Sequence, residues 1–156
     1  MKRDLVIFPD DRLTTVCDPV KAFDSNLHEL VDDLFSVMYA NDGVGLAAPQ
    51  IGVLQRVFVM DCREGRKPHN PLCFINPEIL VMTGADFDEE GCLSMPGVLL
   101  SVRRATYLHF ASLTLSGDRH GASLRGLEAR IMQHEIDHLS GILFTERALE
   151  AAGRRK

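Results

Sequence analysis

The stretch QHEIDHLSG, residues 133–141, contains the pattern His-Glu-x-x-His within a segment of helical periodicity. Four residues recur at steps of four, three and four, namely Leu127, Ile131, His134 and His138. They share one face of a helix that we expect over residues 127–139. The two imidazoles project from that face one turn apart and can bind one metal ion. Glu135 lies about 100° around the helix, where it can act as a general base on a water at the metal. The alternative is a chance histidine pair beside a solvated glutamate.

The third metal ligand decides the class of reaction, because a catalytic site of this kind takes three protein ligands. One class of zinc proteases continues this motif to a third histidine, but the chain has Phe144 there. The only acids further downstream are Glu146 and Glu150, which follow Phe144 closely. An upstream ligand is favoured, and the candidates are Cys92 and the acids beside it in DEEGCLSMPG, residues 88–97. A thiolate in such a loop would bind a divalent ion strongly.

The rest of the chain predicts one helix followed by several strands. Residues 25–40 carry apolar side chains at helical spacing. Segments rich in β-branched and aromatic residues indicate strands at RVFVMD (56–61), LCFINP (72–77) and EILVM (78–82), with two more between 99 and 115 and a turn at 116–118. We therefore expect an α+β fold, with antiparallel β-sheets packed around the metal-binding helix. No repeat or linker is evident, so residues 1–156 are expected to form a single catalytic domain.

Composition excludes several classes of function. The formal net charge of -5 gives no electrostatic case for binding nucleic acid or an anionic membrane. The first residues do not resemble a secretory signal, and no stretch is long enough to span a bilayer, so we expect a cytoplasmic protein. The 4 cysteines are widely and irregularly spaced, which does not indicate a disulfide framework.

Three motifs together resemble the peptide deformylase family. They are GVGLAAPQ (43–50), EGCLSMPG (90–97) and QHEIDHLSG (133–141), in the order typical of that family. The resemblance implies that Cys92, His134 and His138 bind one divalent metal ion and that a water fills the fourth position. Fe²⁺ is the implied ion, and Zn²⁺, Ni²⁺ or Co²⁺ can substitute for it.

The resemblance also implies the reaction, a metal-dependent hydrolysis that removes the formyl group from formylmethionyl nascent peptides and releases formate. Glu135 would take the proton of the attacking water and pass it to the leaving nitrogen. The side-chain amide of Gln50 and the backbone N–H of Leu93 would stabilise the oxyanion. The implied partner is the nascent peptide, met at the ribosome, with neither a sequence-specific nucleic acid nor a membrane as partner.

Substrate binding by this resemblance falls to two groups of residues. The backbone of Gly45 and Gly91 would pair with the peptide from two sides. An apolar pocket would select methionine, lined by Val44, Leu127, Ile131, the His134 ring and the aliphatic stem of Arg130. For these side chains the alternative is ordinary core packing. An ion pair between Glu90 and Arg104 is implied, and Asp137 is either a group near a ligand or a surface acid. Many family members carry arginine where this chain has Leu99.

Three other functions are weighed against deformylation. A metallopeptidase would cut internal bonds, but its third ligand would differ from Cys92. A deformylase-like relative with weak or altered activity would be expected to have lost a ligand, Glu135 or Gln50, and this chain retains all of them. A zinc-stabilised binding module would need a fourth protein ligand, and the sequence offers none that is evident.

Overall fold

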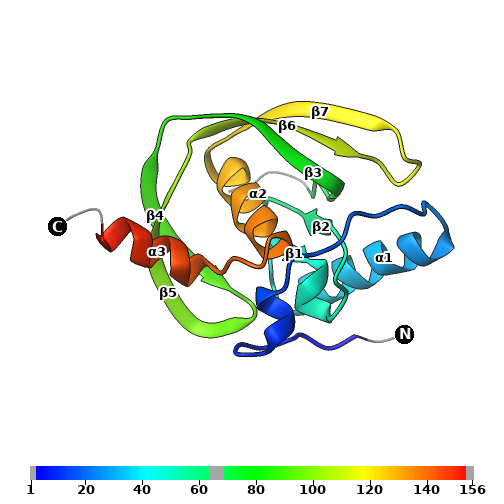
Figure 1. Cartoon of the computed structure of the whole chain (residues 1–156), viewed down its shortest axis with the longest axis horizontal. Coiled ribbons are helices and arrows are strands. Elements are labelled where there is room, and N and C mark those ends of the chain that lie inside the picture. Colours follow the sequence, from blue (N-terminus) through cyan, green and yellow to red (C-terminus); the bar gives the residue numbers. More distant parts are fainter. Residues whose placement is uncertain (1–2, 64–68, 154–156) are drawn as a thin grey trace.

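The computed structural model describes residues 3–63 and 69–153. Within them the elements are η1 (Asp11–Thr14), α1 (Ser25–Ala40), β1 (Gly45–Ala47), η2 (Ala48–Ile51), β2 (Val57–Met60), β3 (Leu72–Thr83), β4 (Asp86–Cys92), β5 (Met95–Arg104), β6 (Tyr107–Leu113), β7 (Arg119–Arg125), α2 (Gly126–Leu139) and α3 (Phe144–Gly153). In Figure 1 helix α2 lies at the centre with strands around it, while α1 and α3 lie on opposite sides.

The strands form two antiparallel sheets. One has five strands in the order β1-β2-β3-β6-β7, and the other is the two-stranded pair β4-β5. The predicted α+β architecture, with antiparallel sheets around the helix of the histidine motif, is confirmed.

Helix α1 covers one part of the five-stranded sheet and has the predicted bounds. The Asp24 carboxylate caps its start by accepting from the Leu27 N–H at 3.2 Å. The apolar face buries Leu27, Leu30, Val31, Leu34 and Met38. These side chains pack with Leu46 of β1 and with Val57 and Val59 of β2. This cluster holds β1 in place, and β1 is one wall of the site described below.

Helix α2 is buried on most of its circumference. Its apolar side chains Ala129, Met132 and Leu139 pack against the sheet residues Phe58, Phe74 and Phe110. The helix begins at Gly126, with φ of 58°, and is followed by Gly141, with φ of 72°. A Cβ at Gly141 would also lie 2.7 Å from the Thr14 carbonyl oxygen, so this position requires glycine. The glycines therefore fix both ends of the helix that carries the histidines.

Strand β3 corrects one expectation. Two strands divided at Asn76-Pro77 were predicted, but residues Leu72–Thr83 form one strand with a register shift between Ile75 and Glu78. Asn76 has φ of 49°, and its side-chain amide bonds to both the N–H and the carbonyl of Val20, at 2.8 and 2.9 Å. This distant partner stabilises a bulge, so the strand bends and continues where a break between two strands was expected.

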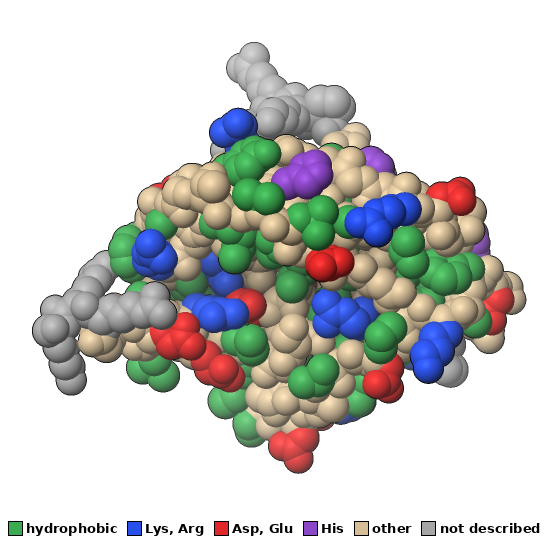
Figure 2. Space-filling model, turned by 45° about the horizontal axis from the view of Figure 1, so that its top comes forward, with side chains coloured by type: hydrophobic (Ala, Val, Ile, Leu, Met, Phe, Trp, Pro, Cys, Tyr) green, Lys and Arg blue, Asp and Glu red, His purple; other side chains and the backbone are tan. Residues whose placement is uncertain are grey.

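The surface of the described residues has mixed charge. On the face in Figure 2, acidic and basic side chains are interspersed with hydrophobic ones. No helix in residues 3–63 and 69–153 has the length and apolar character needed to cross a membrane. Cys17, Cys73 and Cys92 are free thiols.

Candidate active site

Three potential metal donors from two elements meet at the centre of the molecule. His134 and His138 lie one turn apart on α2, and their Nε2 atoms are 3.2 Å apart. Cys92 ends strand β4, and its Sγ lies 3.4 Å from Nε2 of His138. One donor atom from each of the three residues lies within 4.8 Å of the other two. The expected upstream cysteine and the two histidines are thus brought together.

A tight turn between β4 and β5 presents Cys92 to the helix. Cys92 pairs with Met95 across this turn, after a register shift that follows Glu90. The N-terminal segment supports the turn, because the Phe8 N–H donates to the Ser94 carbonyl at 2.9 Å. The position of the sulfur is therefore set by strand pairing and by a contact with the start of the chain.

The chemistry of the donors fits a divalent transition metal. One thiolate and two imidazoles form a set that Zn²⁺ and neighbouring first-row ions accept. Burial and the nearby charge of His134 hold the pKa of His138 well below its usual value, which keeps this imidazole in the neutral, ligating form. Burial also lowers the pKa of His134, but hydrogen bonds with Cys92 and Glu90 outweigh it and raise that pKa to about 10. These two partners therefore favour positive charge beside His134 Nε2, which a metal cation can supply in place of a proton.

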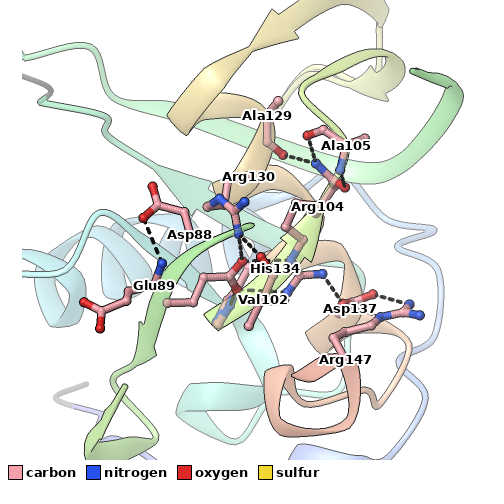
Figure 3. Close-up of polar contacts among 12 residues, drawn as sticks. Asp88, Glu89, Val102, Arg104, Ala105, Ala129, Arg130, His134, Asp137 and Arg147 are labelled. Carbon is pink, nitrogen blue, oxygen red and sulfur yellow. Dashed lines mark hydrogen bonds and ion pairs between the residues drawn. The ribbon is translucent and has the colours of Figure 1, made fainter. Parts of the chain in front are cut away.

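Glu90 fixes the orientation of the His134 ring. Its Oε1 lies 2.9 Å from His134 Nδ1, so Nδ1–H donates to the carboxylate and Nε2 faces Cys92 and His138. Arg104 and Arg130 also donate to Glu90, as Figure 3 shows in part. Burial raises the pKa of Glu90, but the hydrogen bonds from His134 and Arg104 lower it to about 2. The carboxylate is thus kept ionised, and the expected Glu90–Arg104 ion pair is confirmed at 2.9 and 3.0 Å.

Glu135 has the opposite environment. Its side chain is only 4% exposed, and its Oε2 has no hydrogen-bond partner among the described residues. Burial raises the pKa of Glu135 to about 7. Its Oε1 lies against the backbone of β1, where a Cβ at Gly45 would come within 2.7 Å of it. This carboxylate can exchange a proton near neutral pH with a group in the cavity.

Gln50 is buried in η2 with a fixed amide orientation. Its Oε1 accepts from the Ala47 N–H at 3.0 Å, so its Nε2 faces the other way, toward Ser94 Oγ at 3.1 Å and Cys92 Sγ at 3.5 Å. The amide donor therefore lies beside the cysteine. Ser94 is completely buried and was not singled out from the sequence, although it belongs to the motif of residues 90–97.

A cavity of about 680 Å³ opens onto these groups. It has the size of a small-molecule or peptide-end site. Among the predicted site residues, all but His138 line it: Val44, Gly45, Gln50, Gly91, Cys92, Leu93, Leu127, Arg130, Ile131, His134 and Glu135. Ile131 is buried, while Val44 is 40% exposed and Leu99, also in the lining, is 65% exposed. The apolar wall near the donors thus continues to an apolar mouth.

Two charged residues near the cavity have buried partners. Arg130 lines the cavity, as expected for its stem, and its guanidinium is buried and pairs with Glu90 and Asp86, both at 2.7 Å. Asp137 is buried as well, so it is not a surface acid. It accepts from Arg104 and from Arg147, a residue of α3 that sequence reasoning missed. No local signal marks Arg147, because its partner belongs to another helix.

Comparison with known proteins gives a consistent result. The sequence profile of a family described as polypeptide deformylase matches residues 2–153. A peptide deformylase of Alkalilimnicola ehrlichii is 44% identical over 152 residues, which are 97% of this chain and 85% of that protein. The solved structure of the Thermotoga maritima peptide deformylase has a TM-score of 0.88 and 38% identity, covering 94% of this chain and 97% of that one. The solved structure of a Met-Ala-Ser-bound class I type b peptide deformylase from Acinetobacter baumannii has a TM-score of 0.89 and 36% identity. The match covers 94% of this chain and 98% of that one.

Proposed function

The chain belongs to the polypeptide deformylase family, and on that premise we propose which of its residues carry the reaction. The activity is the hydrolytic removal of the N-terminal formyl group from nascent peptides. The observation that carries the assignment is the convergence of Cys92, His134 and His138 beside a cavity whose lining includes Glu135 and Gln50.

Cys92, His134 and His138 would hold one divalent metal ion, with Fe²⁺ as the physiological ion. When bound, the ion supplies Lewis-acid activation of water and polarises the formyl carbonyl. Glu90 keeps the Nε2 of His134 free for the ion by accepting its Nδ1 proton. The thiolate of Cys92 adds a negative charge that a neutral ligand would not provide.

Glu135 would accept a proton from the water that attacks the formyl carbon and then deliver it to the leaving nitrogen. A pKa near 7 suits both transfers, because the group can be protonated and deprotonated in one cycle at neutral pH. The unpartnered Oε2 leaves one carboxylate oxygen available for the water. The products are formate and a peptide with a free amino terminus.

Gln50 would donate from Nε2 to the oxyanion that forms on the formyl oxygen, together with the backbone N–H of Leu93. The amide is already oriented by Ala47 and needs no reorganisation as charge develops. Loss of one such donor raises the barrier by about 2.7–4 kcal/mol in comparable sites. Ser94 Oγ would keep Nε2 in place when no substrate is present.

The substrate peptide would add to the free edge of β1. Strand β1 is the edge of the five-stranded sheet, and Gly45 lies on it at the cavity wall. Gly91 lies on β4, and the two strands belong to different sheets. Backbone pairing accepts any sequence, which suits an enzyme for many nascent chains. The methionine side chain would enter between Leu127 and Ile131, and the peptide named in the Acinetobacter structure begins with methionine.

The test is a formate-release assay on a formyl-Met tripeptide with the metal-loaded Glu135→Gln variant. The substitution keeps the shape and removes the base, so kcat should fall by about 10²–10⁴-fold while metal content and thermal stability stay unchanged. Glu128→Gln on the same helix, outside the cavity lining, is the control and should keep the parental rate. A metal-replete Glu135→Gln enzyme within a few-fold of the parent would show that Glu135 is not the base.

A further inference from the structure

We propose that helix α3 takes part in the metal centre, with Asp137 and Arg147 as positioning residues for the ligand His134. The inference rests on the proposed metal site and goes beyond it, because neither residue touches the donors, the cavity or a substrate. It starts from a chain of charged groups that runs from α3 to the imidazole (Figure 3). A direct contact between α3 and the same imidazole supports it independently.

The chain of charges is continuous and of hydrogen-bonding length at every step. Arg147 holds the Asp137 carboxylate with two bonds, from Nε at 3.0 Å and Nη2 at 2.9 Å. The same carboxylate accepts from Arg104 Nη1 at 2.6 Å. Arg104 then holds Glu90 with two bonds, and Glu90 accepts from His134 Nδ1 at 2.9 Å. Paired bonds between guanidinium and carboxylate fix orientation as well as distance.

Because these charged groups are partly or largely buried, each depends on its neighbour for a partner of opposite charge. The exposed side-chain fraction is 35% for Arg147, 11% for Asp137, 4% for Arg104 and 6% for Glu90. Arg104 lies between two carboxylates, and Asp137 lies between two guanidiniums. Removing the charge of Asp137 would leave Arg104 and Arg147 facing each other without an anion between them. Arg104 would then be drawn toward Glu90 alone, and the carboxylate that orients His134 would shift.

The second contact is made by the first residue of α3. Phe144 is 1% exposed, and its ring centroid lies 5.8 Å from that of His134. This is the position where the protease motif would have a third histidine. Helix α3 therefore restrains the orientation of the His134 ring by two routes. Phe144 packs against the ring, and the series of ion pairs that starts at Arg147 ends at His134 Nδ1.

Arg147 ties α3 to α2 through its two hydrogen bonds to Asp137. Phe144 is the only buried residue of this helix. Beside Arg147, a cleft of about 530 Å³ lies between α3 and the sheet, lined in part by Arg103, Ile136 and Ala151. The Arg147–Asp137 pair is the described ion pair that joins α3 to the rest of the fold.

Fold stability alone does not account for such an arrangement. Buried ion pairs are commonly no more stabilising than apolar residues of the same size, because desolvation offsets their attraction. The ion pairs here fix side-chain orientation, since each bidentate pair holds the next group in one orientation. A ligand histidine needs such direction, and outer partners of this kind affect metal affinity by about 10–100-fold.

The test measures Co²⁺ affinity of the metal-free full chain by competition with a chelator, together with the absorption spectrum of the Co²⁺ form. Asp137→Asn keeps the shape and should weaken Co²⁺ binding by about 10–100-fold. Arg147→Met should weaken it by about 10-fold, and Arg147→Lys, which keeps the charge, should recover part of the loss. Both weakened variants should show altered thiolate-to-cobalt absorption. Glu150→Gln, which removes the outer partner of Arg147 at 3.5 Å, is the matched control and should bind like the parent.

The outcomes separate this inference from the proposed function. Parental Co²⁺ affinity and spectrum in folded Asp137→Asn and Arg147→Met would overturn the role of α3 and leave the metal assignment intact. Lower thermal stability with unchanged Co²⁺ affinity would also overturn it, because the charges would then be only structural. If Asp137→Asn fails to fold, Arg147→Met and Arg147→Lys decide the question. Failure of the parent to bind Co²⁺ would overturn the metal assignment and this inference with it.

Discussion

Replacement of Gly45 by alanine tests whether Glu135 works from one defined position. A Cβ at residue 45 would lie 2.7 Å from Glu135 Oε1 and 2.9 Å from Ile131 Cγ2. Ordinary contact begins near 3.4 Å, so the carboxylate oxygen must retreat by roughly 0.7 Å, the difference between these distances. Misplacement of a reacting group by about 1 Å can cost 10²-fold in rate, so we expect kcat to fall by about 10- to 100-fold.

The fold should tolerate this change. Gly45 is not among the glycines with positive φ, so alanine can adopt the same backbone conformation. Alanine has less conformational freedom than glycine in the unfolded chain, which favours folding by about 0.4–1 kcal/mol and offsets part of the cost of the clash. The displaced atom is the end of a side chain and not backbone. The free energy of unfolding should therefore change by less than about 1 kcal/mol.

The assay follows formate release from a formyl-Met tripeptide, with metal content and thermal unfolding measured on the same samples. Backbone groups of residue 45 remain available to the peptide, so kcat should fall more than KM rises. Gly153→Ala is the control, because a Cβ there meets no atom within 4 Å. A fully metallated Gly45→Ala enzyme with parental kcat would refute the view that the position of the Glu135 carboxylate limits the rate.

Three further predictions concern other parts of the molecule. Cys92→Ala should lose tight metal binding, since only the two histidines remain, and one metal per chain retained after dialysis would contradict this. Leu99→Arg, at the exposed mouth of the cavity, should lower KM for peptides with an acidic third residue and leave kcat unchanged; equal effects on acidic and neutral peptides would argue against it. Although burial raises the pKa of Asp61, hydrogen bonds from Tyr39 and the Asn70 N–H lower it overall. Its stabilising effect is thus complete above the unfolded pKa of about 3.9 and is lost as pH falls through the folded pKa, so the stability difference between the parent and Asp61→Asn should shrink from pH 5 to pH 3 in urea unfolding.

Helices α1 and α2 could be predicted because their signals are local. The apolar spacing of residues 25–40 reproduces α1, and the spacing around His134 and His138 reproduces α2 to within one residue. The histidine pair follows from helical geometry alone. Cys92, by contrast, lies on β4 and meets α2 across more than forty residues of chain, so helical spacing could not single it out. It was one of several upstream candidates until the three motifs were taken together.

The features that were missed depend on distant partners. The bulge in β3 is stabilised by bonds between Asn76 and Val20, which are 56 residues apart. Helix α3 has one buried residue and therefore a weak pattern. The pairing of Arg147 with Asp137 joins two helices, so neither residue could be distinguished from a surface charge. Sequence periodicity reports which face of an element is buried, and it does not report which charges meet across elements.

The two buried glutamates of the site illustrate how the fold assigns different chemistry to the same side chain. Glu90 and Glu135 are 7% and 4% exposed, so burial raises the pKa of each. Hydrogen bonds from His134 and Arg104 outweigh this effect at Glu90 and lower its pKa to about 2. Glu135 has one oxygen without a partner, and its pKa rises to about 7. A carboxylate that stays ionised can orient a ligand, while one that titrates near neutral pH can move a proton. In the proposed mechanism Arg104 therefore serves the reaction indirectly, since it keeps the orienting carboxylate from competing with Glu135 for the proton.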